Sequence, residues 1–295
     1  MDWQDRIISL YLKISELSQQ TLRHFCQRFS NNSQPLFTDE EVITIYMSGI
    51  EQGYKTIKQI HEHASSYWKA LFPKLPGYAA FNHRLNRLED VFTVLVELYQ
   101  SAFPSDYFKE THYRVIDSMP IVMAQQGRRF HAKVAPEIAS SGGYCATKKL
   151  YYYGVKLHIM GSYQKGQLPV PEYIGITAAD MADIKAYEQL LADDCITDYE
   201  KFADKAYIGK QTENTQTYTP VKKEKGQEHL DASDQLYSAA ISRIRQPIES
   251  FNNWIEEKTG IQKASKVRSK KGLMVHIFGR LSVGFKLLYQ RMCQS

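Results

Sequence analysis

The sequence predicts a mixed α/β protein in which an all-helical N-terminal region precedes a core of strands and helices. Two observations carry this prediction. Apolar residues recur at helical spacing over residues 1 to 105, and short β-rich runs begin at Tyr113. The length of 295 residues favours about two domains, because domains typically contain about 100–150 residues. With 43% hydrophobic and 23% charged residues, the composition excludes collagen-like, disordered and disulfide-scaffold proteins.

Four helices are predicted in the N-terminal region. The first follows apolar residues over 7–22, and residues 38–41 (TDEE) form a capping box that opens the second. The third covers residues 56–71, and the fourth runs from residue 79 to 102. Short helices joined by tight turns are compatible with a helix-turn-helix DNA-binding domain over residues 1–108, and equally with a plain helical bundle.

A core with a mixed five-stranded sheet is predicted over residues 109–260. The expected order is strands 113–121, 150–160 and 172–177, helix 183–191, strands 199–203 and 216–221, and a helix from Ser233. The Ser/Gly run at residues 140–143 is expected to be a turn. Residues 261–295 are expected to form a basic linker and a C-terminal helix that packs on the core.

Three acidic residues stand out by their context. Asp117 interrupts an apolar strand, where a buried and unpaired carboxylate would be costly. Asp204 ends another strand, and Glu249 lies on the polar side of a helix that carries Ile248 and Phe251 on its apolar side. Each acid alone has an ordinary structural explanation. Together they would form an oxygen-rich pocket, which favours two Mg²⁺ ions, with Mn²⁺ as a substitute, over Zn²⁺.

Positive charge is concentrated near the C-terminus. Residues 241–295 contain 11 Lys or Arg and 3 acidic residues, a net charge of +8, while the rest of the chain carries −3. Five of these cations gather at Lys263, Lys266, Arg268, Lys270 and Lys271. Such a cluster suits a polyphosphate backbone, because neutralising phosphates releases condensed counterions. A solvated loop between two helices explains it equally well.

Other classes of protein find no support in the sequence. The four cysteines, Cys26, Cys145, Cys195 and Cys293, show neither metal-ligand spacing nor a disulfide pattern. No apolar stretch approaches the ~20 residues needed to cross a bilayer, and the N-terminus does not have the pattern of a secretory signal. We therefore expect a cytoplasmic protein without a membrane partner.

Four segments of the sequence are specific in combination. They are VIDS at residues 115–118, YGVKLH at 153–158, ADKAYIG at 203–209 and RxxxE at 245–249. Together they resemble the core of bacterial insertion-sequence transposases of the DDE type, most closely insertion-sequence family 982. The resemblance covers essentially the whole chain, and separations of 87 and 45 residues between the three acids suit that class.

The resemblance implies a DNA transposase with a ribonuclease-H-like core. Asp117, Asp204 and Glu249 would be the catalytic, metal-binding triad, and water and then a DNA 3′-hydroxyl would attack phosphodiesters at the element ends and the target. The implied partners are double-stranded DNA, as terminal inverted repeats and target, and a second copy of the chain. The expected location is the cytoplasm, on the bacterial nucleoid when bound to DNA, and no small-molecule cofactor is implied.

Basic residues supply candidate DNA contacts. Lys156 and His158 share one strand face and could reach the scissile phosphate, although a solvated sheet face is the plainer interpretation. Arg245 could brace Glu249 or touch a phosphate. The full set of candidates is Arg128, Arg129, Lys133, Lys156, His158, Arg245, Lys258, Lys263, Lys266, Arg268, Lys270 and Lys271.

The segment around Glu249 departs from the pattern of the wider group. That group often has a Tyr three residues before the Arg and a Lys seven after the Glu, whereas this sequence has Ser242 and Glu256 there. Lys258 is the candidate to take the role of the lysine that the wider group has seven residues after the Glu. Pro247 either kinks the helix or starts a new one. A non-catalytic DNA-binding protein derived from a transposase is the alternative function, and a metal-dependent phosphatase of small molecules is a third.

Overall fold

The chain forms two compact units in a computed structural model. The structure describes residues 2–26, 35–104, 112–146, 148–163, 165–191, 199–208 and 216–293. The first unit, which we call the helical unit, comprises Met1–Ala102, Ile255–Ile261 and Lys266–Ser295. The second, which we call the sheet unit, comprises Phe103–Trp254 and Gln262–Ser265.

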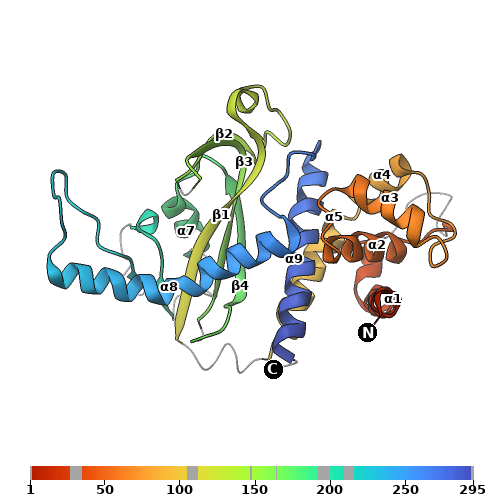
Figure 1. Cartoon of the computed structure of the whole chain (residues 1–295), viewed down its shortest axis with the longest axis horizontal. Coiled ribbons are helices and arrows are strands. Elements are labelled where there is room, and N and C mark those ends of the chain that lie inside the picture. Colours follow the sequence, from red (N-terminus) through yellow and green to blue (C-terminus); the bar gives the residue numbers. More distant parts are fainter. Residues whose placement is uncertain are drawn as a thin grey trace. The chain divides into compact units, whose positions relative to one another are not determined.

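Helices form the first unit, and Figure 1 labels them. They are α1 (Trp3–Gln20), η1 (Leu22–His24), α2 (Asp39–Glu51), α3 (Ile57–Tyr67), α4 (Tyr78–Asn86), α5 (Glu89–Ala102) and α9 (Lys270–Cys293). Thr38 opens α2 with the capping box that the sequence predicts. The single helix expected over residues 79–102 is instead two helices, α4 and α5, because Arg87 and Leu88 close α4 with turn hydrogen bonds.

The C-terminal helix α9 contributes to the core of the helical unit. Val275 and Val283 of α9 belong to the same cluster of buried side chains as Phe92 of α5. Gly279 lets α9 approach α2 closely, because a Cβ atom there would lie 2.5 Å from the ring of Tyr46. Helix α9 therefore packs with the N-terminal helices within the helical unit.

The sheet unit contains the strands and the helices between them. In order they are β1 (Tyr113–Gln125), η2 (Gln126–Phe130), β2 (Ser140–Cys145), β3 (Leu150–Ser162), β4 (Val170–Ala178), α7 (Asp183–Leu191), β5 (Glu200–Phe202), η4 (Lys205–Tyr207), β6 (Thr217–Tyr218) and α8 (Ala232–Thr259), which belongs to this unit up to Trp254. The bounds of α7 are those expected from the sequence. None of the described helices combines the length and apolar character that a membrane-crossing segment needs.

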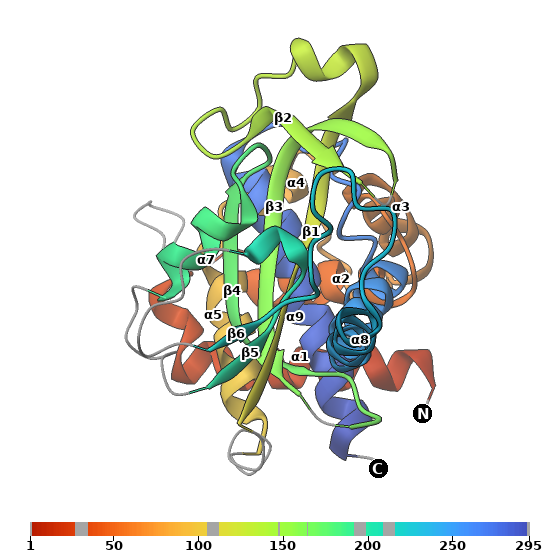
Figure 2. The same cartoon turned by 90° about the vertical axis from the view of Figure 1, so that its left-hand side faces the viewer.

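The described strands form one mixed sheet. Strand β3 pairs antiparallel with β1 and β4, β1 pairs in parallel with β5, and β5 pairs in parallel with β6. In Figure 2, α7 lies to the left of these strands and α8 to their right. This arrangement of a mixed sheet with flanking helices is consistent with the predicted ribonuclease-H-like fold.

Strand β2 adds a sixth strand to the five that the sequence predicts. It pairs with β3 where a turn is expected, because the Ser/Gly run has the composition of a turn. The structure shows a different reason for the glycines. A Cβ atom at Gly143 would lie 2.6 Å from the side chain of Ala179 and 2.8 Å from the ring of Tyr152, so the close packing of β2 requires a residue without a side chain.

Helix α8 continues through Pro247 as one helix. Of the two interpretations of this proline, the start of a new helix is therefore wrong. Ile248 and Phe251 are fully buried, as their positions on the apolar side predict. Glu249 consequently lies outside the core, with its side chain half-exposed.

Candidate active site

Asp117 lies within β1, opposite Ile159 of β3. Burial raises the pKa of Asp117 to about 6, while the guanidinium of Arg245, the backbone of Ser118 and the amide of Asn252 act in the opposite direction. The negative charge of Glu249 adds to the increase. The fold therefore holds this carboxylate where its charged form is disfavoured, and a nearby positive charge stabilises that form.

Asp204 follows the end of β5, the parallel neighbour of the strand that carries Asp117. Val115 of β1 pairs with Phe202 of the parallel strand β5, and each acid follows two residues later. The carboxylate of Asp204 accepts a hydrogen bond of 2.7 Å from the backbone N–H of Lys205 and thereby caps η4. Ligands gather at the carboxyl ends of parallel strands, so this placement suits a functional site.

Helix α8 presents Arg245 to all three acids. Its Nη2 lies 3.8 Å from Asp117 Oδ1, and its Nη1 lies 3.6 Å from Asp204 Oδ1 and 3.5 Å from Glu249 Oε1. Arg245 is buried, whereas Asp204 and Glu249 are half-exposed. Acids that are 87 and 45 residues apart in the sequence thus surround one guanidinium.

Asn252 is a residue of this site that the sequence analysis did not single out. Its Nδ2 donates a hydrogen bond of 2.8 Å to Asp117 Oδ2. Among the described residues, neither Asn252 Oδ1 nor Arg245 Nε has a hydrogen-bond partner, although both atoms are buried. The helical spacing of residues 245, 249 and 252, at i, i+4 and i+7 on one face, is a signal that could have identified Asn252.

The donor chemistry of the site suits a hard divalent cation. In the described residues, no group of three or more His, Cys, Asp and Glu side chains is arranged to hold a metal ion as it stands. Three carboxylates nevertheless meet at one positive charge, and Asn252, whose Oδ1 has no partner among the described residues, hydrogen-bonds one of them through its Nδ2. Oxygen donors of this kind are the ligands that Mg²⁺ and Mn²⁺ prefer.

Comparison with protein families gives a match over most of the sheet unit. The family described as Transposase DDE domain matches residues 111–283, a span that includes Asp117, Asp204 and Glu249. The chain belongs to the DDE transposase family. This confirms the resemblance to DDE transposases and implies an enzyme that acts on DNA. Comparison with curated proteins and with solved structures gives no match.

Next to Asp117, the transposase has a chain of polar side chains, of which Tyr207 and His158 are buried and Ser118 and Thr177 are partly buried. Tyr207 hydrogen-bonds Ser118, and its Oη lies 3.5 Å from Nδ1 of His158, whose Nε2 lies 2.8 Å from Thr177 Oγ1. Burial lowers the pKa of His158 to about 4 and raises the pKa of Tyr207 well above its ordinary value. Both groups are therefore neutral near pH 7, and they link η4, which carries Tyr207, to β3, which carries His158.

Lys156 and His158 both contact other groups of the protein. Lys156 Nζ donates hydrogen bonds of 2.8 Å to the backbone oxygen of Met181 and 2.9 Å to Asp183 Oδ1. His158 is buried. In this arrangement neither side chain is exposed to a phosphate that approaches from solvent. The contacts of Lys156 and His158 to DNA stay predictions.

The other candidate DNA contacts of the transposase are mostly on its surface. Arg129 is half-buried, and Lys258 and Lys271 form ion pairs of 3.0 Å with Glu257 and 2.6 Å with Glu89. The remaining candidates are exposed, and they are Arg128, Lys133, Lys263, Lys266, Arg268 and Lys270. Their roles in DNA binding also stay predictions.

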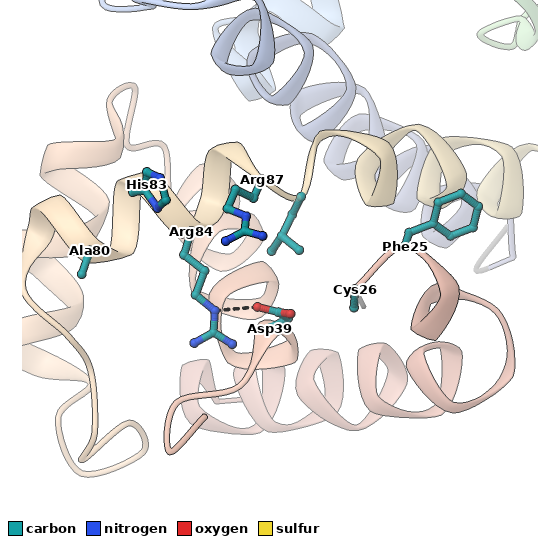
Figure 3. A pocket seen from close by; sticks show the side chains of 8 residues that line it. Phe25, Cys26, Asp39, Ala80, His83, Arg84 and Arg87 are labelled. Carbon is teal, nitrogen blue, oxygen red and sulfur yellow. Dashed lines mark hydrogen bonds and ion pairs between the residues drawn. The ribbon is translucent and has the colours of Figure 1, made fainter. Parts of the chain in front are cut away.

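The helical unit of the transposase contains a cavity of about 260 Å³, shown in Figure 3. Basic groups of α4 and the turn after it line the cavity, namely His83, Arg84 and Arg87. Arg84 Nε forms an ion pair of 2.5 Å with Asp39 Oδ1. Figure 3 shows Arg84 and Asp39 pointing toward each other across this cavity.

Proposed function

We propose that this chain is a DNA transposase that cuts and joins phosphodiester bonds at the ends of an insertion element. Asp117, Asp204 and Glu249 are its catalytic acids in this proposal. The supporting observation is the convergence of the three carboxylates on Arg245 at 3.5–3.8 Å. We also propose that the chain belongs to insertion-sequence family 982, because four of its sequence segments resemble that family.

Two Mg²⁺ ions, which Mn²⁺ can replace, are the proposed cofactors. Bound between the three acids, they would stabilise the charge that develops on the attacking and leaving oxygens during displacement at phosphorus. Asn252 fixes the orientation of Asp117 by donating to its Oδ2. Arg245 offsets part of the negative charge of the three carboxylates and keeps them close together.

Double-stranded DNA is the proposed partner. We assign the binding of the terminal repeats to the helical unit, as a helix-turn-helix domain, because the short helices α2 and α3 are joined by a turn over residues 52–56 and α4 carries His83 and Arg84. The exposed cations of residues 263–271 would neutralise phosphates. A homodimer on DNA is part of the proposal, because transposition brings two element ends together.

Strand cleavage by the full-length protein tests this proposal. The substrate is a plasmid that carries the two ends of the element encoding the chain, with Mg²⁺ or Mn²⁺ supplied. We expect Asp204→Asn and Glu249→Gln to reduce cleavage about a thousandfold or more, because each removes a charged ligand from the metal-binding acids.

Glu188→Gln is the matched control, since it removes an exposed carboxylate from α7 of the same unit. This variant should cleave at the parent rate. Equal melting temperatures of all variants establish that they are folded. Cleavage at the parent rate by either triad variant, or undiminished cleavage in excess chelator, would contradict the proposal.

A further inference from the structure

A row of exposed aromatic rings lies where β2 pairs with the start of β3. Tyr144 and Tyr151 are register partners with ring centroids 4.6 Å apart, and they are 48% and 54% exposed. The guanidinium carbon of Arg129 lies 4.8 Å from the ring of Tyr151 and 4.2 Å from the ring of Phe130, which is 66% exposed. We call these four side chains the aromatic platform.

Contacts within the sheet unit hold the aromatic platform in place. Arg129 Nη1 donates a hydrogen bond of 2.8 Å to the backbone oxygen of Ser141. Two residues further along β3 than Tyr151, the buried Tyr153 donates from its Oη to the backbone oxygen of Val134 at 3.0 Å. In Figure 1, η2 and the chain leading to β2 stand at the upper end of these strands. A surface that is already ordered binds a ligand without a large entropic cost of ordering.

The charge around the aromatic platform identifies the kind of ligand. Residues 126–151 contain five Lys or Arg residues and one acidic residue, a net charge of +4. Arg128 and Lys133 are exposed. Cations beside exposed rings bind single-stranded nucleic acid, because the cations neutralise phosphates and the rings stack on bases. In a duplex the bases are already stacked on one another, so the rings can accept only bases that have left the duplex.

A second copy of the chain is the other occupant that an exposed apolar surface could have. Strand β2 lies at an edge of the described sheet, which is a place where strands of two chains can pair. In a two-fold symmetric contact, however, the same surface of each copy meets itself. Two regions of net charge +4 would then face each other. The charge therefore favours nucleic acid over a second copy.

We propose that the aromatic platform binds an unpaired DNA strand by stacking its bases on Tyr144, Tyr151 and Phe130. The inference rests on the proposed transposase function and deepens it, because cutting one strand at an element end leaves nucleotides that can separate from their partners. The platform is then a second DNA-binding surface of the sheet unit, distinct in its chemistry from the three acids around Arg245.

Fluorescence anisotropy with the full-length protein tests the inference. The labelled probes are a single strand of mixed sequence, a blunt duplex of the same length and a duplex with a single-stranded tail. We expect the double variant Tyr144→Ala/Tyr151→Ala to bind the single strand and the tailed duplex about tenfold more weakly, because stacked bases are lost. Binding to the blunt duplex should stay within about twofold, because the phosphate contacts remain.

Two controls separate stacking from other effects. Tyr144→Phe/Tyr151→Phe keeps the rings and should bind like the parent. Tyr237→Ala removes an exposed tyrosine of α8 from the same unit and should leave all three affinities unchanged. Equal melting temperatures show that each variant is folded.

Three results would overturn the inference. They are unchanged single-strand binding in the alanine variant, an equal loss on the blunt duplex, and a loss of self-association in sedimentation with unchanged DNA binding, which would assign the surface to a second copy. A different result would contradict the proposed function. Cleavage that survives Asp204→Asn and Glu249→Gln contradicts that function alone, whereas triad-dependent cleavage with ring-independent strand binding contradicts this inference alone.

Discussion

Arg245 in the sheet unit and Arg280 in the helical unit are both buried, and their partners differ in kind. Arg280 donates hydrogen bonds to the backbone oxygens of Thr259 and, at 2.7 Å, Lys55, and its Nε lies 3.2 Å from His276 Nδ1. Arg245 faces three carboxylates at 3.5–3.8 Å. Its Nε finds no acceptor in the part of the chain that the structure describes.

The difference shows which buried charge belongs to a candidate site. Arg280 is held by directed hydrogen bonds to carbonyl oxygens, so it connects the end of α8 to the segment before α3. Arg245 is held by longer ion pairs to acids that are themselves partly exposed. Burial alone therefore does not distinguish them. The chemistry of the partners does, because clustered carboxylates carry the negative charge that attracts a divalent cation, whereas backbone carbonyls are neutral.

The largest expected effect on stability comes from Arg280→Met. The substitution removes the donors to two backbone oxygens and to His276 inside the helical unit, and we expect it to lower the free energy of unfolding by about 3 kcal/mol. Urea denaturation measures the loss, and hydrogen exchange should show that α9 loses protection. Arg245→Met is the matched comparison, and an equal loss in both variants would break the distinction between the two arginines.

The second effect concerns pH and the helical unit. Burial, together with the charge of Arg280, lowers the pKa of His276 to about 3 from its ordinary 6.5. Between these two pH values His276 binds a proton in the unfolded chain but not in the folded chain. The contribution of neutral His276 to the free energy of unfolding is therefore fully present above pH 6.5 and is lost as the pH falls. Between pH 7 and pH 5 the loss should be about 2 kcal/mol.

Denaturation of the parent and of His276→Gln at both pH values measures this contribution. Glutamine keeps an N–H donor for the backbone oxygen of Ile261, which His276 Nε2 contacts at 2.8 Å, and does not titrate. The difference in stability between the two pH values should be smaller in the variant by about the same 2 kcal/mol. An identical pH dependence in both proteins would show that His276 is not the group responsible.

The smallest effect distinguishes the two arginines most directly. Without divalent ions, Arg245→Met should lower the free energy of unfolding by about 1 kcal/mol, because three partly exposed carboxylates lose their shared cation. Added Mg²⁺ should restore most of the melting temperature, since it can take the place of the guanidinium charge. The melting temperature of Arg280→Met, in which the three acids and Arg245 are intact, should respond to Mg²⁺ no more than that of the parent does. A metal response in neither variant would contradict the assignment of the acids to a metal site.

Local patterns were sufficient to predict much of the fold. The capping box at Thr38 begins α2, and α7 has the expected bounds 183–191. Caps and helical periodicity depend on a few neighbouring residues, which any segment carries with it. The sequence does not predict strand β2, because the glycines at its centre have the composition of a turn. The packing of Gly143 against Ala179 and Tyr152 depends on distant segments.

The sequence by itself determined which acids stand out, because a carboxylate within an apolar strand or at a strand end is visible in a local pattern. Only the tertiary structure decided that Arg245 lies among them and that Asn252 holds Asp117. It also decided that α9 packs with the N-terminal helices. These contacts depend on which faces of distant elements meet, and a helix face has no fixed partner until the chain has folded around it.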